Sequence, residues 1–139
     1  MSDFNTTIVD EFRANNGTVQ TMGFGRSLVL VHSIGAKSGA QRTIPLAGIP
    51  VDDGWLIAAS AAGAPSNPAW YHNLLAHPDI SLDYPTADSI DSTPVTAVEL
   101  TGADRDAGWQ QFVDRSPAFA DYQVKAGDRT IPVFLLRRG

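Results

Sequence analysis

Hydrophobic positions follow two periods along this chain, and the alternation between them predicts short helices between β-strands. Ile8, Val9 and Phe12 recur at helical spacing, so we expect a short amphipathic N-terminal helix over residues 5–14. Six runs rich in aliphatic, aromatic or β-branched side chains predict strands. They cover residues 27–32, 43–49, 55–59, 80–84, 94–100 and 131–136.

Turn and cap residues divide these runs. Asp52, Asp53 and Gly54 predict a tight hairpin turn. Asn67 and Pro68 are typical of an N-cap and the first residue of a helix. Further helical segments are expected over residues 68–76, from the capping-box-like start at 101 to Pro117, and over 119–125.

The order of these elements favours an α+β fold. The strands are unevenly spaced and can pair antiparallel, which predicts a small barrel with helices packed outside it rather than a doubly wound sheet. The chain has 139 residues, 43% of them hydrophobic, and shows no internal repeat or low-complexity linker. We therefore expect one domain spanning residues 1–139.

Composition narrows the function classes. A net charge of -5 argues against nucleic-acid binding and against binding to anionic membranes, because both need a basic face. The chain has no cysteine, and His32, His72 and His77 lack a metal-ligand spacing, so we expect no metal. His32 ends a strand and is expected to be structural. Neither a signal peptide nor a membrane-spanning run is recognisable, and a cytoplasmic protein is the default expectation.

One glycine-rich turn concentrates positive charge. Lys37 and Arg42 are the only basic residues between Arg26 and Arg105. They lie between two β-type runs, with several backbone N–H groups that we expect to be free, so the turn could hold an anion. The alternative is a solvated hairpin loop whose cations serve solubility. The spacing is not that of a P-loop.

The helix expected after residue 67 carries a second signal. Trp70, Asn73 and Leu74 share one face at positions i, i+3 and i+4. They could be core anchors with an amide that satisfies a backbone group, or a wall for a planar, hydrogen-bonding ring. The start of the helix and the small-residue loop at 60–66 offer further N–H groups for an anion. A phosphate next to a planar ring indicates a nucleotide-like or flavin-like cofactor.

Several blocks in a fixed order give the chain a family resemblance. It resembles the deazaflavin-dependent nitroreductases, which use reduced coenzyme F-420 on a split β-barrel related to flavin-mononucleotide-binding oxidases. The blocks extend from about residue 26 to the C-terminus. They are Gly35-Ala36-Lys37-Ser38-Gly39 with Arg42 and Pro45, residues 59–64, Asn67-Pro68-Ala69-Trp70-Tyr71-His72-Asn73-Leu74, Phe119-Ala120-Asp121-Tyr122-Gln123 and Asp128-Arg129-Thr130-Ile131-Pro132.

The resemblance implies a coenzyme F-420 site and no metal. The cofactor's phosphate side would contact Lys37, Ser38, Arg42, Thr43, Ile44, Pro45 and Leu46. Its ring and ribityl chain would contact Ala58, Ala59, Ser60, Ala61, Trp70 and Asn73. Ser60 and Tyr122 are the candidate catalytic residues, for a hydrogen bond near the ring and for orienting the acceptor or relaying a proton.

The implied reaction is hydride transfer from the reduced deazaflavin to a small conjugated acceptor, such as a quinone, an enone or a nitro compound. One alternative is a flavin-mononucleotide-dependent reductase of the same fold, and another is a non-catalytic deazaflavin carrier. The sequence leaves the oligomeric state open, with a homodimer as one option.

The chain departs from the family pattern at four positions. Ala36 and Ala61 stand where relatives carry basic residues, so Lys37 and Arg42 are expected to carry most of the charge that meets the anion. Ser116 and Phe119 stand where two tyrosines would line the acceptor side in some relatives, which leaves Tyr122.

Overall fold

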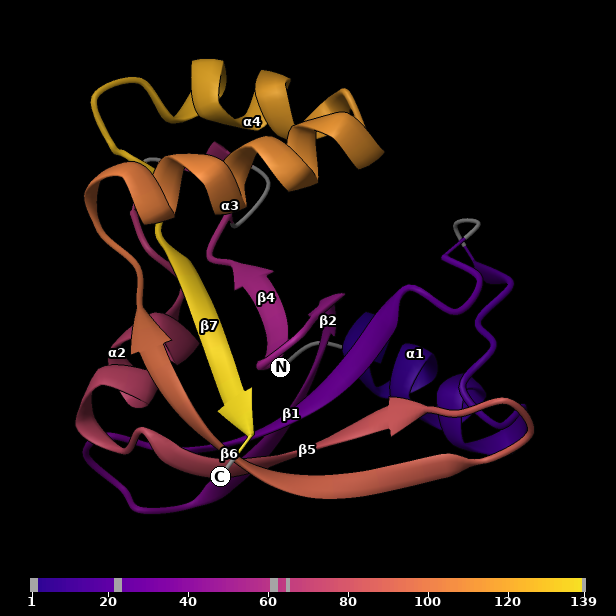
Figure 1. Cartoon of the computed structure of the whole chain (residues 1–139). Helices are drawn as coiled ribbons and strands as arrows, with labels where there is room; N and C mark the ends of the chain where they lie inside the picture. The colour runs from indigo at the N-terminus through magenta and orange to yellow at the C-terminus, as the bar shows by residue number, and fades with distance from the viewer. Residues whose placement is uncertain (1–2, 22–23, 61–62, 65, 139) are drawn as a thin grey trace.

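A computed structural model of the chain describes residues 3–21, 24–60, 63–64 and 66–138. Within these residues, seven strands form one sheet in the order β2-β1-β5-β6-β7-β4-β3, with every neighbouring pair antiparallel. The strands are β1 (Leu28–Ile34), β2 (Gln41–Ala47), β3 (Ile49–Val51), β4 (Gly54–Ala58), β5 (Asp79–Pro85), β6 (Ile90–Glu99) and β7 (Val133–Arg138). β2 and β4 contact each other although they are first and sixth in this order, because the sheet curls into a half-closed barrel (Figure 1).

Four helices accompany the sheet in the described part of the chain. They are α1 (Asp3–Ala14), α2 (Ala69–Ala76), α3 (Gly102–Arg115) and α4 (Ala118–Ala126). Figure 1 shows α3 and α4 together at the top of the molecule and α1 on its right. The expected α+β barrel of antiparallel strands with helices packed against it is confirmed.

Three hydrophobic clusters explain this arrangement. The first fills the barrel and includes Trp70 and Leu74 of α2. The second joins α3 and α4 to β4 and β7, and Phe112 is its largest fully buried side chain. The third packs Ile8 and Phe12 of α1 against β1. The helical spacings in the sequence therefore correspond to faces that are buried in the structure.

Strand β1 shows why its sequence is apolar at consecutive positions. Val29 and Val31 face the barrel cluster, while Leu28 and Leu30 face the α1 cluster. Successive side chains of a strand point to opposite faces, so a strand covered on both sides needs apolar residues without interruption.

The strand expected over residues 43–49 is in fact two strands. β2 ends at Ala47 and β3 begins at Ile49, and Gly48 separates them. The Gly48 amide donates to the Ser27 carbonyl at 2.9 Å, and a Cβ at this position would meet Val29 at 3.0 Å. The backbone at Gly48 lies so close to β1 that there is little room for a side chain, and the chain changes direction between β2 and β3 at this residue. The hairpin turn predicted at residues 52–54 is confirmed, since Val51 pairs with Gly54.

Several predicted boundaries are shifted by one or more residues. Strand β1 continues to Ile34, so His32 does not end its strand, and β7 covers Val133–Arg138 instead of 131–136. Two further boundaries are wrong because of tertiary contacts. Helix α2 begins at Ala69 with Pro68 as its N-cap, because the Asn67 side chain accepts a hydrogen bond from Arg129 (2.6 Å) instead of capping the helix. Strand β6 begins at Ile90 rather than at residue 94, because the pairing with β5 continues through the acidic segment expected to be a link. At α3 the predicted N-cap, Thr101, is correct, although its side chain makes no cap hydrogen bond.

Candidate functional site

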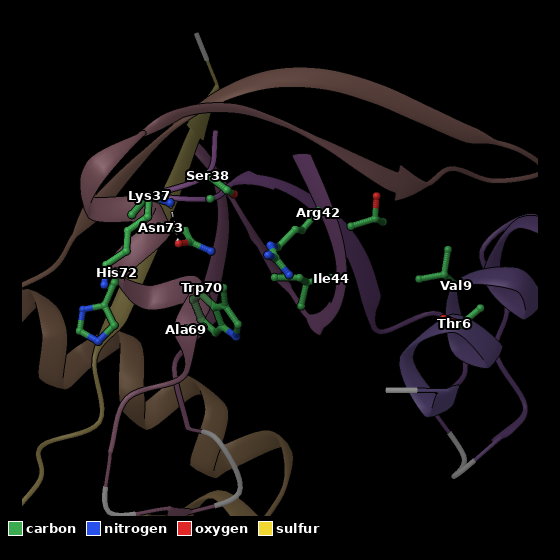
Figure 2. Close-up of a pocket in the computed structure, with 13 residues that line it drawn as sticks. Thr6, Val9, Lys37, Ser38, Arg42, Ile44, Ala69, Trp70, His72 and Asn73 are labelled. Atoms are coloured by element: carbon green, nitrogen blue, oxygen red, sulfur yellow. Dashed lines mark hydrogen bonds between the residues drawn. The ribbon is translucent and has the colours of Figure 1, made fainter. Parts of the chain in front are cut away.

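A cavity of about 1060 Å³ opens between the end of β1, the edge strand β2, α1 and α2. Lys37 and His72 lie on its α2 side, and Thr6 and Val9 of α1 close the opposite side (Figure 2). Cavities of this size are typical of small-molecule sites. The lining residues are Thr6, Val9, Gly35, Ala36, Lys37, Ser38, Arg42, Thr43, Ile44, Ala69, Trp70, His72 and Asn73.

The turn formed by residues 35–42, here called the cation turn, is held largely by its own backbone. Gly35 N–H donates to the Ala40 carbonyl at 2.8 Å, and Gly39 N–H donates to the Gly35 carbonyl at 2.9 Å. Ala40 N–H donates to Ser38 Oγ at 3.1 Å. Gly39 has φ +72°, a conformation that glycine adopts without strain.

Asn73 connects this turn to helix α2. Its Oδ1 accepts a hydrogen bond from Ala36 N–H at 3.0 Å, and the residue is buried. Four amides of the cation turn are therefore bonded within the protein, so the turn offers fewer free N–H groups than expected. Among the described residues, no hydrogen-bond partner is found for the amides of Lys37 and Ser38, which remain for a ligand. Asn73 does satisfy a backbone group, and that group belongs to the turn that carries the cations.

The charged side chains that line the cavity are all positive. Lys37 and Arg42 are exposed and line the cavity together with the exposed His72. None of its lining residues is acidic, although the chain has 15 Asp and Glu residues and a net charge of -5. An anion that enters this cavity meets two permanent positive charges and no carboxylate on the lining side chains.

The structure brings seven of the sequence-predicted cofactor residues into this one cavity. They are Lys37, Ser38, Arg42, Thr43, Ile44, Trp70 and Asn73. Trp70 also belongs to the barrel core, so the two interpretations of its helix face, core anchor and cavity wall, describe the same residue.

The remaining predicted residues lie elsewhere. Pro45, Leu46, Ala58, Ala59 and Ser60 do not line the cavity. Ala61 lies outside the described residues. Tyr122 packs edge to face against Phe119 at 5.6 Å, in the cluster beneath α3 and α4.

A half-buried arginine organises the segment that contains Ser60. Arg129 donates from Nη1 to the Ala59 carbonyl (3.0 Å) and to Asn67 Oδ1 (2.6 Å), from Nη2 to the Ser60 carbonyl (2.8 Å) and from Nε to the Ala64 carbonyl (2.9 Å). Burial lowers the pKa of the Arg129 guanidinium from its ordinary value. We call the described part of residues 59–67 the anchored loop.

The anchored loop also lies tightly against α4. Gly63 has φ +82°, and a Cβ there would be 2.8 Å from the Tyr122 carbonyl oxygen. Packing against α4 therefore requires glycine at position 63, whatever the loop binds. Tyr122 reaches this loop through its backbone.

The sequence reasoning missed Arg129 as a functional candidate, together with the lining residues Thr6, Val9, Ala69 and His72. Arg129 belongs to a block that carries the family resemblance, and this membership is the one sign in the sequence that could have indicated its importance. Four acceptors spread over residues 59–67 can be matched to one guanidinium only in three dimensions.

Comparisons with known proteins identify the family. The family model described as F420H(2)-dependent quinone reductase matches residues 5–138. The chain belongs to this family. The predicted deazaflavin-type reductase, with coenzyme F-420 as its cofactor, is thereby confirmed.

Individual relatives agree with this assignment. An F420H(2)-dependent quinone reductase of Mycobacterium tuberculosis is 35% identical over 132 residues, which cover 91% of this chain and 85% of the relative. The solved structure of an F420-H2 dependent reductase, FDR-A, is 38% identical with a TM-score of 0.70, over 81% of this chain and 95% of that one. A structure described as a domain-swapped dimer is 34% identical with a TM-score of 0.72, over 95% and 93% of the two chains.

More distant structures share the fold alone. The haem storage protein HutZ from Vibrio cholerae has a TM-score of 0.61 at 10% identity, over 94% of this chain and 87% of that one. Among the described residues, no helix is long and apolar enough to cross a membrane. The same residues contain no cluster of three or more His, Cys, Asp or Glu side chains suited to a metal ion.

Proposed function

We propose that this protein transfers a hydride from reduced coenzyme F-420 to a quinone. The observation that carries the proposal is the cavity in which the two cations of the cation turn meet the Trp70 and Asn73 side chains with no acidic lining residue. A cofactor with an anionic chain and a planar ring needs this combination of groups.

The residues present fit such a cofactor. Lys37 and Arg42 would hold its phosphate by charge-assisted hydrogen bonds, with the Ser38 and Thr43 hydroxyls beside them. Pro45 and Leu46 would continue this phosphate side along β2. Trp70 and Asn73 would hold the ring and ribityl chain, together with Ala58, Ala59, Ser60 and Ala61. The cavity volume of about 1060 Å³ is large enough for a ligand of this size.

The bound coenzyme supplies the hydride donor, and the protein supplies position and a shielded pocket. Ile44 and Val9 give the cavity apolar walls that reduce its exposure to water. Ser60 and Tyr122 remain our candidates for a hydrogen bond near the ring and for orienting the acceptor. Both residues are held by a neighbour: Arg129 donates a hydrogen bond to the Ser60 carbonyl, and the Phe119 ring packs against Tyr122.

Binding of the purified protein to oxidised coenzyme F-420 and to flavin mononucleotide tests the cofactor assignment. We expect saturable binding of the deazaflavin and much weaker binding of the flavin. The reverse preference would overturn the proposal.

The acceptor is tested by mixing the protein with reduced coenzyme F-420 and following its reoxidation. Quinones should be reduced fastest. Enones and nitroaromatics form the wider acceptor class that we propose on chemical grounds, since both accept a hydride at a conjugated, electron-poor position.

A second candidate function is a non-catalytic deazaflavin carrier. It is favoured by one observation: Ser60 and Tyr122 do not line the cavity that holds the anion-binding residues. Tight binding of the coenzyme without turnover on any acceptor of the panel would support the carrier, and turnover on any of them would exclude a purely sequestering role.

We also propose that the chain forms a homodimer. Support comes from the 34% identical structure described as a domain-swapped dimer, which aligns with 95% of this chain. Light scattering during size-exclusion chromatography should give twice the 14.8 kDa chain mass. A monomer at all concentrations would contradict this.

A further inference from the structure

A chain of polar contacts crosses three strands and ends at the cavity. On β5, Asp83 Oδ2 lies 3.0 Å from His32 Nε2 on β1. His32 Nδ1 in turn lies 3.1 Å from Oγ1 of Thr43 on β2, and Thr43 lines the cavity. The His32 and Asp83 side chains are only 13% and 14% exposed. Strand pairing places them together. His32 pairs with Thr43 of β2, and Asp83 of β5 pairs with Leu30, which lies two residues before His32 on the same face of β1.

Asp83 fixes which nitrogen of His32 carries a proton. A carboxylate is an acceptor only, so the nitrogen beside it must be the donor in both the neutral and the charged imidazole. The other carboxylate oxygen of Asp83 accepts a hydrogen bond from Ser92, which holds the carboxylate in place. The proton that comes and goes with pH is therefore the one on Nδ1, next to Thr43.

The state of Nδ1 decides the direction of the Thr43 hydroxyl. When Nδ1 is bare, it accepts the hydroxyl proton of Thr43, whose oxygen lone pairs are then left for the cavity. When Nδ1 is protonated, it donates to Thr43 Oγ1, and the hydroxyl proton is free to donate to an anion. The Gln41 amide nitrogen lies 3.3 Å from Nδ1 and is a second, exposed donor to the bare nitrogen.

We propose that His32, held by Asp83, is a positioning residue that sets the hydrogen-bond direction of Thr43 and so makes anion binding in the cavity depend on pH. Protonation of His32 adds a donor at the cavity wall without placing the imidazole in the cavity. This rests on the proposed function in one respect, that the ligand of the cavity is anionic.

The surroundings of His32 are mostly neutral. On β2 its contacts are Thr43 and Gln41, on β5 the contact is the carboxylate of Asp83, and β6 reaches the pair through Ser92. The charged and titratable groups of the cavity itself are Lys37, Arg42 and His72. Imidazole is the side-chain type that ordinarily changes its charge between pH 5.5 and 8.5.

The tautomer can be tested without any ligand. Nitrogen-15 NMR of the histidine side chains across pH 5.5 to 8.5 should show His32, assigned by its loss in His32→Gln, as the Nε2-protonated tautomer when neutral. A neutral His32 protonated on Nδ1 would overturn the inference, whatever the protein binds.

Binding of oxidised coenzyme F-420 over the same pH range gives the second test. The affinity of the wild type should fall about tenfold more from pH 5.5 to 8.5 than that of His32→Gln, the size expected for one hydrogen bond to a charged group. Thr43→Val should lose the same share of the pH dependence, and Thr43→Ser, which keeps the hydroxyl, should retain it. Any pH effect of the other cavity residues and of the ligand is common to all variants and cancels in the comparison.

Equal pH dependence in wild type and His32→Gln would overturn the inference and leave the proposed function intact. Failure of the wild type to bind the coenzyme at any pH would instead count against the proposed function, and the NMR measurement would then decide the inference alone.

Discussion

The cation turn and the anchored loop are each fixed by one polar side chain from elsewhere in the chain, in opposite senses. Asn73 accepts a single hydrogen bond from the cation turn, at Ala36 N–H. Arg129 donates four hydrogen bonds to acceptors of the anchored loop. Apart from its own backbone hydrogen bonds, the turn is thus tied to α2 at one point and projects its charged side chains outward, whereas the carbonyl groups of the loop point toward a half-buried cation.

This difference separates stability from binding. Arg129, which holds the anchored loop, is half-buried and makes four hydrogen bonds to it, so its loss should lower the free energy of unfolding. The cations of the cation turn are exposed, so their loss should weaken ligand binding and leave the fold unchanged. The following variants test this separation.

The largest effect is expected for Arg129→Ala. It leaves the Ala59, Ser60 and Ala64 carbonyls without their donor, and we expect the free energy of unfolding to fall by about 3 kcal/mol. Urea denaturation measures the change, with Arg129→Lys as the matched variant that keeps the charge and loses the fork of donors. A loss below about 1 kcal/mol in Arg129→Ala would show that the loop does not depend on this anchor.

The double variant Lys37→Ala/Arg42→Ala should weaken binding of oxidised coenzyme F-420 by about tenfold to a hundredfold, because charge-assisted hydrogen bonds to the phosphate are lost. Its unfolding free energy should stay within about 0.5 kcal/mol of wild type. Arg115→Ala/Arg137→Ala, which changes the net charge equally at exposed positions outside this cavity, is the control. Unchanged affinity in the first variant would remove the anion site from the cation turn.

Asn73 joins the two effects in one residue. Asn73→Ala removes the acceptor for Ala36 N–H and should cost about 1 to 2 kcal/mol of stability, with looser binding of the coenzyme. Asn73→Asp keeps an acceptor at the same place and adds a negative charge to the cavity, so binding should weaken while the turn remains held. Equal binding by Asn73→Asp and wild type, measured by the same titration, would contradict an anionic ligand next to α2.

The smallest effect concerns α2 itself, which carries Asn73 and is tied to β6 by Tyr71. The Tyr71 hydroxyl donates to Glu99 at 3.0 and 3.2 Å, and burial, followed by the Glu99 carboxylate, raises the pKa of Tyr71. The folded state then holds this proton more strongly than the unfolded state. The contribution to stability is fully present below the ordinary tyrosine pKa near 10 and is lost as the pH rises through the higher folded value.

Denaturation of wild type and Tyr71→Phe between pH 8 and 11 measures this contribution. The wild type should lose measurably more stability than the variant over this range, by up to about 1 kcal/mol. Parallel pH profiles would show that the Tyr71–Glu99 contact adds nothing to the placement of α2.

The sequence was sufficient for the elements that local rules specify. Ile8 and Phe12 lie on one helix face, Asp52 to Gly54 form a hairpin turn, and the scarce cations Lys37 and Arg42 do share a cavity. Where local rules failed, a distant partner competed for the same group. Asn67 is a good N-cap residue, but its side chain is bound by Arg129, which is 62 residues away.

The sequence by itself determined the family, the barrel-forming strands and the positive charge of the cation turn, because each of these depends on residue type and spacing along the chain. Only the tertiary structure decided that Asn73 holds this turn, that Arg129 anchors the loop of Ser60, and that Asp83 and His32 stand behind Thr43. Each of these contacts joins groups brought together by sheet order or by packing. Hydrogen bonds act over about 3 Å in space, a separation that distance along the chain does not specify.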